Sequence, residues 1–214
     1  MVPCQMVNVM VISVERMRKS DAYTIEHLVP SKELMYRAAT GVYESYKEWE
    51  GKRIAIVVGG GNNGGDGYAL AGILIKNGIS PDVIRVSDKL SEDGKHYCDI
   101  AKGMGVGMFS FDKDTDLSKY DVIVDCILGT GFVGDVRGTA RDAIEVINKS
   151  GAYVISVDIP SGMNGDTGEA SLAVVSDLTV SIGFIKQGLV TDAAKKYIKA
   201  LTNVDIGIVL IDGE

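Results

Sequence analysis

A run of β-branched residues that stops in a cluster of glycines places the strongest constraint on this chain. Residues 54–58 read Ile-Ala-Ile-Val-Val and residues 59–67 read Gly-Gly-Gly-Asn-Asn-Gly-Gly-Asp-Gly, before an alanine-rich helical pattern begins at Tyr68. A short apolar run bounded by glycine is typical of a buried strand in a parallel sheet. Glycine costs backbone entropy on folding, so a loop this rich in it indicates close approach of the backbone to something else. Because backbone amides at a helix N-terminus suit an anion, we interpret the loop as part of a nucleotide site.

Predicted strands and helices alternate along most of the chain. We expect strands at 53–58, 81–86, 106–111, 121–126, 152–157, 177–182 and 203–211, and helices at 66–77, 91–104 and 139–149, while 191–201 fits either class. Helices at 13–28 and 31–50 come first, the second with Ser31 as its N-cap and Gly51 at its end. This order predicts an α/β fold whose mainly parallel sheet carries helices on both faces.

Length and composition limit the classes of function. The 214 residues predict a single domain, 1–214, and a net charge of −7 without a basic cluster excludes nucleic acid as a partner. No apolar run approaches the roughly 20 residues of a membrane span. Cys4, Cys98 and Cys126 are widely spaced, as expected for reduced thiols in a cytoplasmic protein. Residues 1–12 lack signal-peptide features, so we interpret them as a disordered leader or as sequence ahead of a later start.

Three polar, glycine-rich loops follow three of the predicted strands. They are residues 59–67, 125–138 and 158–168. Right-handed crossovers bring the C-terminal ends of parallel strands to one edge of the sheet, and ligands bind there at the point where the strand order reverses. We therefore expect the three loops to meet in one crevice.

The first loop contains the dinucleotide-binding pattern G-x-G-x-x-G at residues 59–64. That pattern requires an acidic residue about 20 positions further on, for which Asp88 is a late candidate. Asn62, Asn63 and Asp66 also place amide and carboxylate groups where a plain pyrophosphate turn needs none. A nicotinamide-dependent dehydrogenase is one alternative, and a purely structural strand-to-helix turn is another.

The second loop holds Thr130 and a single cation, Arg137, just ahead of a helix that is predicted to begin near Thr139. Thr139 and Asp142 have the spacing of a capping box. Backbone amides, the helix N-terminus and Arg137 together make a phosphate cradle. The alternative is that Arg137 is a surface cation paired with Asp135.

Asn63, Asp125 and Ser161 offer hard oxygen ligands with a single formal charge. Divalent ions usually recruit more carboxylate or phosphate charge than this. We therefore predict a monovalent cation site, preferably for K⁺. The alternative is that Asp125 and Ser161 cap their loops through hydrogen bonds.

Proton transfer at the crevice has few candidates. His27 and His96 are the only histidines, and both fall outside the strand-end loops. The crevice therefore has no histidine for a catalytic triad or a zinc site. Asp158 is the best-placed carboxylate. Lys186 is a second candidate, with a solvated loop lysine as the alternative interpretation.

Several segments taken together resemble a known family. They are 61–67 (Gly-Asn-Asn-Gly-Gly-Asp-Gly), 125–131 with 134–137 (Gly-Asp-Val-Arg), 157–162 (Val-Asp-Ile-Pro-Ser-Gly), the lead-in 17–24 and the tail segment 185–189. In these motifs the chain is similar to the NAD(P)H-hydrate epimerase family, the YjeF N-terminal domain. The resemblance covers nearly the whole chain from about Met17, with Leu128 at a place where the family often has an aromatic residue.

The resemblance implies a Rossmann-like three-layer α/β/α sandwich and the epimerisation of (6R)- to (6S)-NAD(P)H hydrate, a repair reaction that lets a dehydratase use both epimers. By position, Asn63, Asp125 and Ser161 would hold K⁺. As a separate hypothesis, we assign acid/base help in the inversion to Asp158. The hydrated NADH or NADPH would contact Asn62, Asn63, Gly64, Gly65, Asp66, Gly129, Thr130, Gly131, Phe132, Val133, Gly134, Asp135, Arg137 and Asp158.

The resemblance also bears on partners. We expect the epimerase to stand alone or to meet its dehydratase as a separate chain. The apolar stripe of the second N-terminal helix suggests a homodimer. The alternative function is a non-catalytic nucleotide-binding or scaffold domain of the same fold. Asp125, Asp158, Ser161 and Arg137 argue against it, because a scaffold does not need that set.

Overall fold

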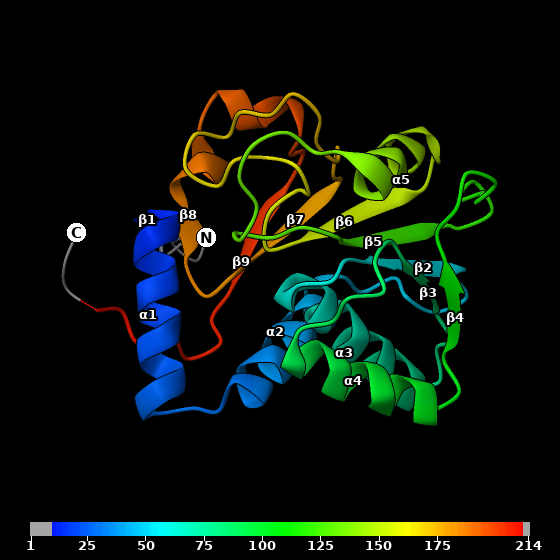
Figure 1. Ribbon diagram of the computed structural model, residues 1–214, viewed down its shortest axis with the longest axis horizontal. Helices are drawn as coiled ribbons and strands as arrows, with labels where there is room; N and C mark the ends of the chain where they lie inside the picture. The colour runs from blue at the N-terminus through cyan, green and yellow to red at the C-terminus, as the bar shows by residue number, and fades with distance from the viewer. Residues whose placement is uncertain (1–9, 212–214) are drawn as a thin grey trace, which may run out of the picture.

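A parallel sheet of seven strands forms the centre of the computed structural model, which describes residues 10–211 (Figure 1). The order across the sheet is β4-β3-β2-β5-β6-β7-β9, and every neighbouring pair is parallel. The strands are β2 (Ile54–Val58), β3 (Asp82–Arg85), β4 (Gly107–Ser110), β5 (Val122–Cys126), β6 (Tyr153–Val157), β7 (Leu178–Ile182) and β9 (Leu201–Val204). The predicted α/β fold with a mainly parallel sheet is confirmed.

Helices cover both faces of the sheet. On one face lie α2 (Ser31–Ser45), α3 (Asn62–Lys76) and α4 (Glu92–Gly103), and on the other lies α5 (Gly138–Lys149), as Figure 1 shows. The short 3₁₀ helices η1 (Gln187–Val190) and η2 (Ala193–Lys196) lie in the long connection from β7 to β9. None of the helices within residues 10–211 combines the length and apolar character that a membrane span needs.

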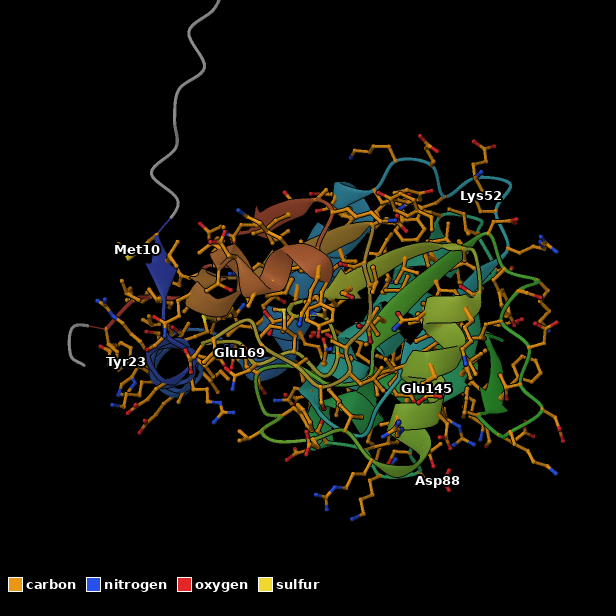
Figure 2. The ribbon with its side chains drawn as sticks, turned by 90° about the horizontal axis from the view of Figure 1, so that it is seen from above. Met10, Tyr23, Lys52, Asp88, Glu145 and Glu169 are labelled. Carbon is orange, nitrogen blue, oxygen red and sulfur yellow. The ribbon has the colours of Figure 1, made fainter. Side chains whose placement is uncertain are left out.

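Helix α1 (Val14–His27) stands at one end of the molecule, beside a small second sheet of β1 (Val11–Ile12) and β8 (Ile185–Lys186). Figure 2 shows Tyr23 of α1 and Lys52, ahead of β2, at opposite ends. Residues 11–12 therefore belong to a strand and not to a disordered leader, because β8 supplies their hydrogen-bond partner. The rest of the predicted leader, residues 1–9, and Cys4 with it, lies outside the described residues.

The central strands are continuous apolar runs because both of their faces are covered. In β2, Ile54, Ile56 and Val58 belong to the core beneath α2, α3 and α4, whereas Ala55 and Val57 belong to the core beneath α5. All five residues are buried. This two-residue alternation between two cores is the expected behaviour of a strand in a doubly covered sheet.

The strand order reverses between β2 and β5. From β2 the chain moves outward to β3 and β4, and then crosses to β5 on the other side of β2. The register places Val58 of β2 level with Cys126 of β5, and the amide of Gly59 donates to the Cys126 carbonyl at 3.0 Å. The first two glycine-rich loops consequently start side by side.

Helix α3 begins at Asn62, four residues earlier than the predicted start at residue 66. Gly64 and Gly67 lie inside the helix because α3 packs closely against β2 and the residues that follow it. A Cβ on Gly64 would lie 2.1 Å from the Gly59 carbonyl oxygen, and one on Gly67 would lie 2.7 Å from a Val58 methyl group. Close packing overrides the low helix propensity of glycine here.

Helix α2 ends at Ser45, not near Gly51 as predicted, and Pro30, not Ser31, occupies the N-cap position. The backbone becomes extended at Tyr46, because the aromatic side chains of Tyr46 and Trp49 are buried just beyond the helix. The Trp49 indole packs edge-on against Tyr46, and its N–H donates to the carbonyl of Tyr43 at 2.9 Å. Burial of these rings stabilises the extended segment after the helix.

Two further local expectations are wrong. The residue at the α5 N-cap is Arg137, and no side chain caps it, so Thr139 and Asp142 form no capping box. The last strand covers 201–204 and not 203–211. Residues 205–211 instead run to α1, where the amides of Val209 and Ile211 donate to hydroxyl groups of that helix.

We expect Gly64→Ala to destabilise the fold by about 1–3 kcal/mol, because the new methyl group would overlap the Gly59 carbonyl oxygen. Gly72→Ala in the same helix is the matched control. A Cβ there would meet only the Met104 sulfur, at an ordinary 3.7 Å, so the helix should gain about 0.5–1 kcal/mol. Urea unfolding of the two variants measures the difference. Equal effects would contradict the close-packing explanation.

Candidate functional site

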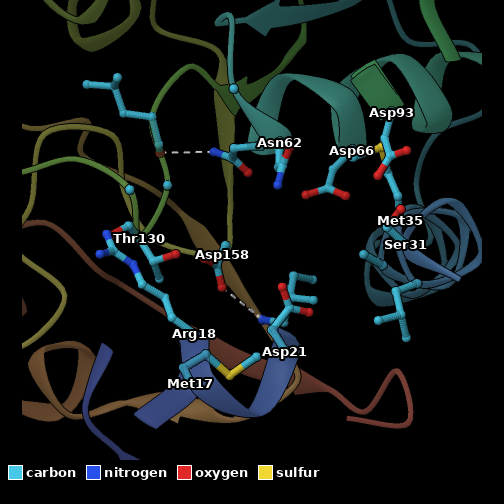
Figure 3. A pocket seen from close by; sticks show the side chains of 18 of the residues that line it. Met17, Arg18, Asp21, Ser31, Met35, Asn62, Asp66, Asp93, Thr130 and Asp158 are labelled. Atoms are coloured by element: carbon cyan, nitrogen blue, oxygen red, sulfur yellow. Dashed lines mark hydrogen bonds between the residues drawn. The ribbon is translucent and has the colours of Figure 1, made fainter. Parts of the chain in front are cut away.

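A cavity of about 580 Å³ lies at the reversal of strand order, at the C-terminal edge of the sheet (Figure 3). The loop after β2, the loop after β5 and Asp158 after β6 all contribute to its walls, as predicted. Helices α1 and α2 and strand β8 complete it. Lining residues include Met17, Arg18, Asp21, Met35, Asn62, Asn63, Asp66, Gly129, Thr130, Gly131, Phe132, Asp158 and Lys186.

The carboxylate of Asp125, at the end of β5, is fully buried behind the cavity. The Ser156 hydroxyl and the Ser161 amide each donate to one carboxylate oxygen at 2.9 Å, and the Ser161 hydroxyl donates to the other. Burial raises the pKa of Asp125, and these hydrogen bonds act in the opposite direction. Within residues 10–211, Asp125 has no cationic partner.

Asn63 and Ser161 meet at the carbonyl of Leu128. The Asn63 side-chain amide donates to this carbonyl at 2.9 Å, and the Ser161 hydroxyl lies 3.1 Å from it. The carbonyl oxygen of the Asn63 side chain is buried and has no hydrogen-bond partner among the described residues. Asn63, Asp125 and Ser161, which come from three separate elements, thus lie together, and the loop-capping hydrogen bonds of the alternative interpretation are also present.

Asp158 follows β6 with φ = 68°, the one non-glycine residue of positive φ in the part of the chain that the structure describes. Its carboxylate accepts a hydrogen bond from the ammonium of Lys186 and a 3.3 Å hydrogen bond from the amide of Ile182. Lys186 is fully buried and also donates to the Ile182 carbonyl at 2.7 Å. The solvated loop lysine considered as the alternative is therefore wrong: β8 holds Lys186 inside the fold, paired with Asp158.

Asp66 and Asp21 add two more carboxyl groups to the cavity wall. Figure 3 shows both directed into the space that they share with Asp158. Burial, followed by the charges of Asp158 and Asp21, raises the pKa of Asp66 well above its ordinary value of 3.8. Burial and the charge of Asp158 also raise the pKa of Asp21, while Lys186 lowers it. The site therefore holds more carboxyl groups than its one buried ammonium can neutralise.

Helix α1 supplies a wall that the analysis of strand-end loops did not include. Met17, Arg18 and Asp21 of this helix line the cavity. The Arg18 guanidinium donates to the carbonyl of Thr130, which joins α1 to the second glycine loop. The lead-in motif at residues 17–24 contained the signal, but only the fold places it beside the sheet edge.

Some of the predicted contact residues lie elsewhere. Gly64 and Gly65 are buried behind the cavity wall, where they allow α3 to pack closely. Val133, Gly134 and Asp135 line a neighbouring hollow of about 540 Å³, which shares Phe132 with the main cavity. Arg137 lines neither and is exposed. Asp135, the partner of Arg137 in the alternative interpretation, accepts a hydrogen bond from the Ser171 hydroxyl at 2.8 Å instead.

The residues that the rival functions would use lie away from the cavity. Asp88, the candidate ribose acid of a dehydrogenase, is 91% exposed and lies 3.7 Å from Arg85. His27 and His96 are exposed on α1 and α4, as predicted. Within residues 10–211 no cluster of three histidine, cysteine or acidic side chains has the arrangement of a metal site. Cys98 and Cys126 are buried, free thiols.

Known proteins resemble this chain over most of its length. A family model described as YjeF-related protein N-terminus matches residues 31–188. An NAD(P)H-hydrate epimerase of Oenococcus oeni is 37% identical over 204 residues, which cover 92% of this chain and 96% of that protein. An NAD(P)H-hydrate epimerase of Lentilactobacillus buchneri is 33% identical over 92% of this chain and 94% of that protein. The crystal structure of the yeast protein ynu0 shares the fold, with a TM-score of 0.77 and 23% identity over 91% of this chain and 87% of that one.

We expect Lys186→Met to destabilise the protein by roughly 3–5 kcal/mol, because it leaves the Asp158 carboxylate without its buried partner. Lys199→Met is the matched control, since the Lys199–Asp177 pair is exposed and its loss should change stability far less. Urea unfolding at neutral pH measures both. A Lys186→Met variant as stable as the control would show that the buried pair does not stabilise the fold.

Proposed function

This chain belongs to the family of YjeF-related protein N-termini, and on that basis we propose that it is an NAD(P)H-hydrate epimerase, an isomerase. The two relatives of this name described above match 92% of this chain over 96% and 94% of their own lengths. The observation that carries the proposal is the meeting of three separate motifs at one cavity: Asn63 on α3, the loop at 127–132 after β5, and Asp158 after β6.

We propose hydrated NADH or NADPH as the substrate, converted from the (6R) to the (6S) epimer. Asn62, Asp66, Asp158 and residues 129–132 would contact the hydrated ring and its neighbouring groups, because they line the main cavity. Residues 133–135 would contact a more distant part of the dinucleotide, since they line the adjoining hollow.

Asn63, Asp125 and Ser161 fit a bound K⁺. The side-chain carbonyl oxygen of Asn63 is buried, and it has no partner among the described residues. Asp125 carries a single charge that no described cation neutralises, and together these are what a weakly charged monovalent site requires. The Leu128 carbonyl, which already lies between Asn63 and Ser161, would be a further oxygen ligand. When bound, K⁺ would supply a positive charge that fixes the loop after β5 against α3.

The hydrated ring carbon is a hemiaminal. Inversion requires loss of its hydroxyl group to give an iminium-like cation, and then addition of water to the opposite face. The carboxyl groups of Asp21, Asp66 and Asp158 favour such a cation electrostatically. We assign acid/base help to Asp158, which Lys186 and the Ile182 amide hold in place.

Four expectations about the wider setting stay predictions. They are that the chain works as one domain, that it is cytoplasmic, that it forms a homodimer, and that its dehydratase is a separate chain. A non-catalytic scaffold function receives less support, because a scaffold does not need a buried Lys186–Asp158 pair facing a cavity.

We expect the protein to accelerate conversion of the (6R) into the (6S) hydrate, and Asp158→Asn to lower kcat by about 10²–10⁴-fold. Chromatographic separation of the epimers, with and without protein, measures both. Asp142→Asn on the exposed side of α5 is the control and should leave the rate unchanged. An Asp158→Asn rate close to that of the unaltered protein would remove the assigned role.

We expect replacement of K⁺ by Li⁺ to lower both the epimerisation rate and the Tm, because ligand binding to the folded state alone stabilises it. In Ser161→Ala the Tm should no longer respond to K⁺. Crystals grown with Rb⁺ should give an anomalous peak beside Asn63, Asp125 and Ser161. The absence of an anomalous peak at these residues would exclude the monovalent site.

A further inference from the structure

We propose that Asp66 is a second catalytic residue, the acid that protonates the departing hydroxyl group, while Asp158 is the base that takes the proton of the incoming water. This inference rests on the proposed epimerase function. It gives two separate roles to two carboxyl groups that face the same cavity from different elements.

The position of Asp66 supports the role of a proton donor. It is the fifth residue of α3, beyond the first turn, where the helix N-terminus no longer favours a negative charge. Figure 3 shows its carboxyl group pointing into the cavity. The Asp66 carboxyl group makes no hydrogen bond or ion pair with any described residue, unlike the Asp158 carboxylate, which accepts a hydrogen bond from Lys186. Its proton is therefore available to a bound molecule.

The charges around Asp66 are mostly negative. Asp158 follows β6, Asp21 lies on α1, and Asp93 on α4 lines the same cavity. Among residues 10–211 the buried cation is Lys186 of β8, which is paired with Asp158, and the Arg18 guanidinium donates to the Thr130 carbonyl. Tyr97 of α4 and Cys126 of β5 are also close enough to interact electrostatically with Asp66.

The surplus of carboxyl groups in the cavity is accommodated if one of them stays protonated. Like charges held together in a partly desolvated site cannot all ionise, so one group keeps its proton. Burial and the neighbouring charges raise the pKa of Asp66 well above that of a free aspartic acid. Two carboxyl groups with different environments and different protonation states are the usual arrangement of an acid and a base in one site.

The two steps balance without any oxidant or reductant. In the first, Asp66 gives its proton to the hydroxyl oxygen, the carbon–oxygen bond breaks, and the lone pair of the ring nitrogen forms the iminium bond. In the second, water attacks the opposite face, Asp158 accepts its proton, and the electron pair returns to nitrogen. The proton then passes from Asp158 back to Asp66 through water in the open cavity.

The test is the dependence of kcat on pH. The unaltered protein should lose activity as pH rises through the raised pKa of Asp66, because the acid must be protonated to act. Asp66→Asn should lower kcat by about 10²–10⁴-fold, with a smaller change in KM, and should abolish this alkaline decline. Asp66→Glu should restore part of the rate together with the decline. Asp21→Asn should move the decline to lower pH, since it removes a neighbouring negative charge.

Asp142→Asn is again the control and should change neither the rate nor the pH profile. Thermal unfolding checks that the Asp66→Asn variant folds. If it does not fold, the pH profiles of Asp66→Glu and Asp21→Asn decide whether Asp66 is the acid. An Asp66→Asn variant with a normal rate, or one that is slow but keeps the alkaline decline, would overturn the role of Asp66 and leave the epimerase function standing. If the unaltered protein does not epimerise the hydrate at all, the proposed function fails, and this inference fails with it.

Discussion

The close approach of α3 to the ends of β2 and β5 is the contact on which the site depends. Gly64 packs against the Gly59 backbone, and Gly67 against Val58 and Cys126, at distances that leave no room for a side chain. This packing places the first turns of α3 directly over the point where the strand order reverses. Asn63 can then reach the Leu128 carbonyl, and Asp66 can face the cavity. The glycines thus serve to position neighbouring side chains.

Three buried or half-buried aspartates of the site are accommodated in three different ways. Asp125 is surrounded by hydroxyl and amide donors and has no cation among the described residues. Asp158 is paired with the buried ammonium of Lys186. The Asp66 carboxyl group has neither hydrogen-bond donors nor a paired cation among the described residues. Burial and the neighbouring negative charges favour its protonated form. These environments give an anion suited to a bound cation, a fixed base and a neutral acid within one small region, which is the set of properties that the proposed reaction needs.

Helix α1 turns an open sheet edge into an enclosed cavity. Two segments hold it: the Val14 amide donates to Asp166 in the loop after β6, and the amides of Val209 and Ile211 near the C-terminal end donate to hydroxyl groups of α1. The Arg18 guanidinium then joins the helix to the loop after β5. Helix α1 therefore contributes a wall that strand-end loops alone would leave open.

The sequence by itself determined the parallel sheet, its two-sided covering and the three loops that meet at one edge, because hydrophobic period and glycine position are local properties of the chain. It also identified Asn63, Asp125, Ser161, Asp66 and Asp158, since strand ends are predictable and parallel strands share one edge. Only the tertiary structure decided that α3 starts at Asn62, that Lys186 is buried against Asp158, and that Asp21 faces the same cavity. Those outcomes depend on close packing and on contacts such as Arg18–Thr130, which joins residues 112 positions apart, and no local pattern encodes partners at that separation.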